Sequence, residues 1–110
     1  MEYEPESYWE ERRLLFDEMI KEVSGLTHVY YDPPESVLME YPAIVYKKTK
    51  MPALYANNKK YVKNIAFEVQ IICEDPDSVY VDRVQDIKYA AFDRHFIADD
   101  LHHDTFTIIF

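Results

Sequence analysis

The segment from Tyr61 to Glu74 constrains the fold more than any other part of this chain. Its apolar residues occupy alternate positions, which is the pattern of a β-strand with one face in a core and the other partly exposed to solvent. The residues predicted to face the core are Ile65, Phe67, Val69, Ile71 and Cys73. Because such a strand must cover its apolar face, the pattern predicts a sheet with other elements packed against it.

A helix is expected over residues 7–24, before that strand. It begins with the capping box Ser7-Tyr8-Trp9-Glu10, in which the serine hydroxyl accepts a backbone N–H bond and the glutamate reaches back to the cap. The apolar residues then follow helical spacing, at Tyr8, Trp9, Leu15, Phe16, Met19, Ile20 and Val23. The helix is expected to end at Gly25, the only glycine of the chain, because glycine adopts the left-handed conformation after a helix without steric cost.

The rest of the chain predicts three further strands, a second helix and a long exposed loop. The strands are expected over residues 26–31, 43–48 and 105–110, the loop over 50–60, and the short helix from near Val79 to near Tyr89. The resulting order is α-β-β-β-α-β, and 110 residues are expected to fold as a single domain over 1–110. These elements predict an α+β fold, with two helices packed on a mostly antiparallel sheet of about four strands.

The charge and composition of the chain argue against several classes of function. The 21 acidic and 12 basic side chains give a formal net charge of −9, which disfavours tight binding to the phosphates of DNA or RNA. The single glycine excludes the glycine-rich loops that bind nucleotide phosphates, and a lone Cys73 excludes an intrachain disulfide or a CxxC pair. Because the start is acidic and no long apolar run follows, we expect a soluble intracellular protein without a signal peptide or membrane span.

The densest polar cluster of the chain combines imidazole and carboxylate side chains. Its members are Asp93, His95, Asp99, Asp100, His102, His103 and Asp104. These side chains are ligand types for a divalent metal, so a small metal-dependent hydrolase using the three histidines and nearby aspartates is one alternative function. We interpret the segment instead as a loop, because alternate side chains of a contiguous loop would point apart. Asp99 and Asp100 are then expected to solvate a turn, and Asp104 to cap the approach to the last strand.

Paired carboxylates, such as Glu68 or Asp75 with Asp99, are a second source of general acid–base chemistry. However, 21 acidic residues produce such pairs by chance, and no nucleophile or zinc-hydrolase motif accompanies them. We therefore expect no enzymatic activity, no cofactor and no bound metal.

Half of the 12 basic residues flank one loop, in contrast to the acidic remainder of the chain. They are Lys47, Lys48, Lys50, Lys59, Lys60 and Lys63. A nucleic-acid contact and a merely solvated loop are alternatives, but the charge segregation favours head-to-tail association, which makes rings when the contacts close. We therefore predict that Lys47, Lys48, Lys59 and Lys60 contact acidic groups of a neighbouring subunit.

Several segments in the second part of the chain resemble a known family. They are Tyr41-Pro42-Ala43-Ile44-Val45-Tyr46, Ala56-Asn57-Asn58, Val69-Gln70-Ile71-Ile72, Asp75-Pro76-Asp77-Ser78, Phe92-Asp93-Arg94-His95-Phe96 and Asp99-Asp100-Leu101-His102-His103-Asp104-Thr105-Phe106-Thr107. Together they resemble the small tail terminator, or tail-to-head joining, proteins of long-tailed bacteriophages. The resemblance covers about two-thirds of the chain, from Pro42 to Phe110, and the N-terminal helix matches in kind.

The resemblance implies an α+β subunit that assembles into a ring, usually a homo-hexamer. Such a ring caps the finished tail tube, stops further addition of tube protein and offers its other face to the head connector. It also implies a virion protein made in the host bacterial cytoplasm, without a catalytic motif. Acidic side chains around the lumen would repel DNA phosphates and let the genome slide through without specific binding. The alternatives are another neck protein, such as a head completion or stopper protein, and an acidic adaptor that binds a host protein.

Overall fold

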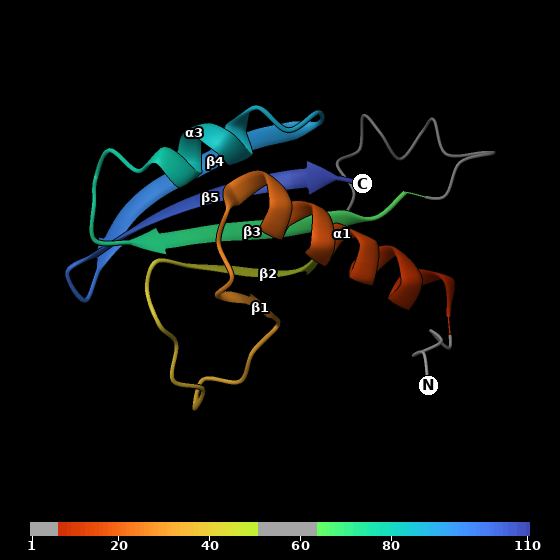
Figure 1. Cartoon of the computed structure of the whole chain (residues 1–110), viewed down its shortest axis with the longest axis horizontal. Coiled ribbons are helices and arrows are strands. Elements are labelled where there is room, and N and C mark those ends of the chain that lie inside the picture. The colour runs from red at the N-terminus through yellow and green to blue at the C-terminus, as the bar shows by residue number, and fades with distance from the viewer. Residues whose placement is uncertain (1–6, 51–63) are drawn as a thin grey trace.

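The computed structural model describes residues 7–50 and 64–110, and Figure 1 shows their arrangement. The helices are α1 (Tyr8–Ser24) and α3 (Val79–Gln85), and the strands are β1 (Val29–Tyr31), β2 (Ala43–Thr49), β3 (Ala66–Cys73), β4 (Ala90–Ala98) and β5 (Leu101–Ile109). These strands form one sheet in the order β1-β2-β3-β5-β4, and of its described pairs only β1–β2 is parallel. Both helices lie on the same face of the sheet, and the predicted α+β class is confirmed.

The core lies between this sheet and α1. Phe67, Val69 and Ile71 of β3 are completely buried, as their alternation predicted. The Phe16 ring of α1 stacks on the Phe67 ring with centroids 4.2 Å apart. On the opposite face of β3, the side chains of Glu68 and Gln70 remain half-buried. The central strand is therefore held by apolar packing on its helix-covered face, which is the arrangement its sequence indicated.

Helix α1 begins and ends within a residue of its predicted bounds. Ser7 Oγ accepts a hydrogen bond from the backbone N–H of Glu10 at 3.1 Å, which is half of the expected capping box. Gly25 takes a left-handed conformation with φ of 80°, and its N–H donates to the carbonyl of Lys21. Beside it, Arg83 of α3 donates to the carbonyl oxygen of Ser24 at 2.7 Å. The end of α1 is thereby tied to α3.

A buried polar contact joins α1 to β2. The hydroxyl of Tyr46, which has no exposed surface, donates to Asp17 Oδ2 at 2.7 Å. Burial and the adjacent Asp17 carboxylate raise the pKa of Tyr46 well above its usual range. Asp17 also forms an ion pair with Lys21 at 2.7 Å. The tyrosine is thus held in its neutral form, where it can donate to the carboxylate.

The sequence did not predict strand β4, so the observed order is α-β-β-β-α-β-β rather than α-β-β-β-α-β. The second helix ends at Gln85 and not near Tyr89, and the last strand begins at Leu101 and not at Thr105. The first strand begins at Val29, three residues later than expected. From residue 51 on, the loop expected over 50–60 lies outside the described residues.

Strand β4 escaped prediction because it lacks a continuous alternation. A β-bulge between Phe92 and Arg94 shifts its register against β5, so its apolar residues do not keep a period of two. As an edge strand it also buries little, and most of its residues are exposed. Asp99 and Asp100, with φ of 52° and 62°, make a tight two-residue turn between β4 and β5. The expected turn is present, but it joins two strands instead of leading out of a loop.

Candidate functional site

The hairpin β4–β5 brings together part of the predicted polar cluster. His95 and Asp104 are register partners on the two strands, and His95 Nδ1 lies 2.7 Å from Asp104 Oδ1. His102 Nδ1 lies 3.2 Å from His95 Nε2. The expectation of a contiguous loop is therefore wrong, because two paired strands bring these three side chains together. Asp104 does not cap the last strand but lies within it.

The two hydrogen-bond partners of His95 determine which of its ring nitrogens carries the proton. A carboxylate oxygen can only accept, so His95 Nδ1 carries the proton in its hydrogen bond to Asp104. In the neutral ring the lone pair of Nε2 is then available, and it faces Nδ1 of His102. The Asp104 side chain is only 9% exposed, whereas that of His95 is 36% exposed. The cluster is thus a buried carboxylate that orients a partly exposed imidazole.

His103 does not belong to this cluster. It follows His102 on β5, so its side chain points to the opposite face of the sheet, where its ring stacks on Phe96 at 4.6 Å. Its Nδ1 is buried and has no hydrogen-bond partner among the described residues. Burial lowers the pKa of His103. The three histidines named for the hydrolase alternative therefore do not lie in one site.

The predicted carboxylate pair of Glu68 and Asp99 is also separated. Glu68 lies in the middle of β3 opposite Thr107, and Asp99 lies at the hairpin tip, roughly 20 Å along the sheet at 3.3 Å per residue. Glu68 and Asp99 therefore cannot act on one substrate atom. Within residues 7–50 and 64–110, no three His, Cys, Asp or Glu side chains converge to hold a metal ion.

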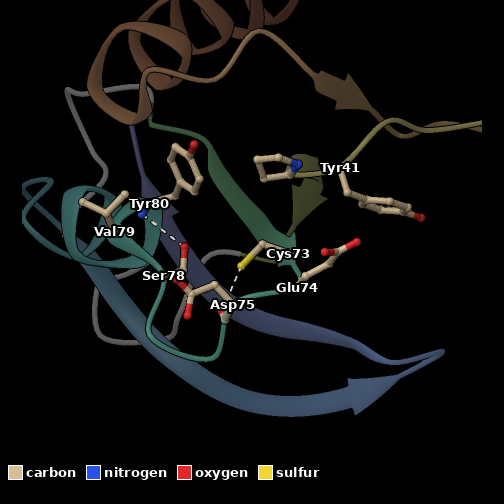
Figure 2. Close-up of a pocket in the computed structure, with 8 residues that line it drawn as sticks. Tyr41, Cys73, Glu74, Asp75, Ser78, Val79 and Tyr80 are labelled. Carbon is tan, nitrogen blue, oxygen red and sulfur yellow. Dashed lines mark hydrogen bonds between the residues drawn. The ribbon is translucent and has the colours of Figure 1, made fainter.

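A hollow of about 380 Å³ lies at the end of the sheet where β3 leads into α3 (Figure 2). It is lined by Tyr41, Pro42, Cys73, Glu74, Asp75, Ser78, Val79 and Tyr80. Its two potential nucleophiles, Cys73 and Ser78, make local hydrogen bonds. Cys73 Sγ donates to the carbonyl of Asp75, and Ser78 Oγ accepts from the N–H of Tyr80 at the start of α3. None of the described residues that line it is a histidine that could act as their base. The mixture of carboxylates and partly exposed apolar side chains suits a contact surface better than a reaction site.

The lysines predicted to contact a neighbouring subunit lie partly within the described residues. Lys47 and Lys48 are exposed in the second half of β2 and point to opposite faces of the sheet. Lys47 lies opposite Glu68 of β3, and Lys48 lies opposite Phe67. Lys59 and Lys60 fall outside the described residues. Figure 1 shows that β2 and β3 run in opposite directions, so the lysines in the second half of β2 lie toward the opposite end of the sheet from the hollow, which adjoins the end of β3.

Strand β4 is the long edge of the sheet and pairs only with β5 among the described strands. Its apolar side chains are unusually exposed, with Phe92 at 54% and Ile97 at 63%. Sequence reasoning missed this edge and the His95–Asp104 pair together. One sequence signal predicts both. If Asp99 and Asp100 form a two-residue turn, residue 98 pairs with residue 101, and the pairing continued along the two strands places residue 95 opposite residue 104.

No protein-family model, curated protein or solved structure matches this chain. Within the described ranges, neither helix is both long and apolar enough to cross a membrane. The function must therefore be inferred from the residues and the geometry.

Proposed function

We propose that the protein is a structural virion protein, a tail terminator that forms a homo-hexameric ring at the end of a bacteriophage tail tube. The ring stops polymerisation of the tube and joins it to the head connector. The proposal rests on the resemblance of residues 42–110 to that family. The observation in the structure that supports it most is the exposed edge strand β4, since a ring needs an adhesive surface on each subunit.

The two edges of the sheet differ in the way expected of a protein that associates through one of them. Natural proteins protect edge strands by keeping them short or by placing proline near them. Edge strand β1 has three residues and is followed by Asp32, Pro33 and Pro34. Edge strand β4 has nine residues and exposes Phe92 and Ile97. Its bulge at Asp93 restricts which strand can pair with it, and this favours a specific partner over aggregation.

Charge separation along the subunit supports a head-to-tail arrangement. Lys47, Lys48 and Lys50 gather at one end of the sheet, and Glu74 and Asp75 border the hollow at the other. Contacts between unlike surfaces of identical subunits form a ring when the rotation closes. In this proposal Lys47, Lys48, Lys59 and Lys60 contact acidic groups of the next subunit.

The net charge suits a ring through which DNA passes. Each subunit carries a formal charge of −9, so acidic side chains are available for the lumen in every copy. Such a lumen repels phosphates, and the genome slides through it without specific binding. One face of the ring would meet the tube protein and the other the head connector, which places the protein in the neck of the virion.

The test is the mass of the purified protein by light scattering over a concentration series, followed by negative-stain imaging with and without tail tubes. A hexamer mass, or rings that form only on tube ends, is the expected result. A protein that stays monomeric in the presence of tubes would overturn the proposal. Rings that bind isolated head connectors but never tube ends would instead assign the protein to another neck layer, as a head completion or stopper protein.

A further inference from the structure

The pair His95 and His102 has the spacing of two ligands on one metal ion. Two imidazole nitrogens bound to tetrahedral zinc at about 2.0–2.1 Å lie roughly 3.3 Å from each other. His95 Nε2 and His102 Nδ1 are 3.2 Å apart, each on a strand of the same hairpin. We propose that His95 Nε2 and His102 Nδ1 together bind a divalent transition-metal cation, with Asp104 as the carboxylate that orients His95.

The hydrogen bond to Asp104 supports this assignment. In metal-bound histidines, the N–H of the second ring nitrogen commonly donates a hydrogen bond to a carboxylate. This bond fixes the tautomer and makes the metal-binding nitrogen more basic. His95 Nδ1 makes that bond at 2.7 Å, and its Nε2 is directed at the candidate site. This arrangement exists in the protein before any ion binds, so little ordering of His95 is required.

His102 must change tautomer for the ion to bind. In the hydrogen-bonded pair, His102 Nδ1–H donates to Nε2 of His95. On binding, that proton moves through solvent to Nε2 of His102, and both imidazoles remain neutral ligands. The ion displaces this hydrogen bond and lies to one side of the line between the two nitrogens, at bonding distance from both, and no net proton is released.

The surroundings favour a cation. Asp104 also lines a hollow of about 240 Å³ that contains Asp77 and Asp82 at the start of α3. Three of the described residues that line this hollow are aspartates, and none of them is lysine or arginine, so their carboxylates favour a divalent cation. Imidazole nitrogen selects zinc, nickel or copper over magnesium or calcium, which prefer oxygen ligands. Because the described part of the chain supplies two ligands, water completes the coordination shell in the isolated chain.

The experiment is a calorimetric titration of the full, untagged chain with zinc sulfate at neutral pH, after dialysis against a chelator and then against buffer. We expect one zinc ion per chain, and no heat of binding with magnesium sulfate. His95→Gln and His102→Gln should each weaken zinc binding at least tenfold. Asp104→Asn should weaken it by about 10–100-fold, the usual effect of removing a carboxylate behind a ligand.

His103→Gln is the matched control, because it removes the neighbouring imidazole on the opposite face of the sheet. It should bind zinc like the parent chain. A measurement without substitution guards against variants that do not fold: zinc should shift the side-chain nitrogen resonances of two histidines and leave His103 unchanged. The absence of saturable zinc binding by the parent chain would overturn the proposal. Unchanged affinity in folded His95→Gln and His102→Gln variants would do the same.

Discussion

Strands β3 and β4 belong to one sheet and have similar lengths, yet they are held in place by different forces. In β3, six of eight residues are buried, and α1 packs over its apolar face. In β4, none of nine residues is fully buried. Strand β4 depends on its hydrogen bonds to β5, on the tight turn at Asp99 and Asp100, and on the contact of Phe92 with Phe106. The comparison teaches that the core determines the stability of this chain, while its edge strand keeps most of its residues exposed.

Substitution of matched phenylalanines tests this difference most strongly. Phe67→Ala in β3 removes a completely buried ring that packs on Phe16, and should lower the free energy of unfolding by about 3–5 kcal/mol. Phe92→Ala in β4 removes a ring that is half exposed, and should cost about 1 kcal/mol or less. Urea unfolding followed by circular dichroism measures both. Equal losses in the two variants would show that β4 is as much a part of the core as β3.

The polar contact beside β3 provides the next largest effect. Tyr46→Phe should lower the free energy of unfolding by about 1.5–3 kcal/mol, because a buried hydrogen bond to the Asp17 carboxylate is lost. Tyr41→Phe, at a partly exposed position, is the control and should change the stability little. Parallel urea titrations of the two variants make the measurement, and a Tyr46→Phe chain as stable as the parent would contradict the contact.

The pH dependence of the same contact has a defined sign. Because the pKa of Tyr46 is raised in the folded chain, its contribution is fully present below the ordinary tyrosine pKa near 10. Above that pH the unfolded chain ionises first, so the contribution is lost as the pH rises. We expect the parent chain to lose more stability between pH 8 and pH 11 than Tyr46→Phe does. A parallel decline of both chains would show that Tyr46 ionises as easily in the folded state.

A smaller change in stability is expected when the turn between β4 and β5 is altered, and this change tests how far the turn stabilises β4. Replacing Asp99 and Asp100 by Asn and Gly supplies the residues that prefer positive φ at both positions of a two-residue turn. The double variant should be more stable by about 0.5–1 kcal/mol, as an optimised backbone position usually is. Thermal unfolding measures it. A destabilised variant would mean that the aspartate side chains make a contact the turn needs.

The smallest effect on stability is expected at the exposed end of β4. Ile97→Asp should change the free energy of unfolding by no more than about 0.5 kcal/mol, since the side chain is 63% exposed. The same change should weaken ring formation, because it places a charge on the proposed subunit contact. Light scattering at matched concentrations separates the two effects. Unchanged assembly would remove β4 from the interface and leave the lysines as the remaining candidate contact.

The comparison also explains how far the sequence could predict this protein. Strand β3 and helix α1 were predicted because their periodic apolar residues, and Gly25 at the helix end, act within a single element. Strand β4 was not predicted, because an edge strand needs few apolar residues. Its bulge at Asp93 also interrupts the two-residue alternation of side chains that identifies a strand. His95 and Asp104 meet only through the register of two strands. A site of that kind depends on pairing across a hairpin, which the residues of one segment do not reveal by themselves.

Strand β5 lies between β3 and β4 although it follows both of them in the chain. During synthesis, the edge of β3 that will receive β5 stays open until residues 101–109 have left the ribosome. At roughly 5–20 residues per second, that delay after Cys73 lasts a few seconds. Throughout it the nascent chain presents a hydrophobic strand with unpaired backbone groups, which is the kind of segment that chaperones bind. The topology therefore leaves the most apolar strand of the sheet with one open edge during translation, although that strand lies in the centre of the finished sheet.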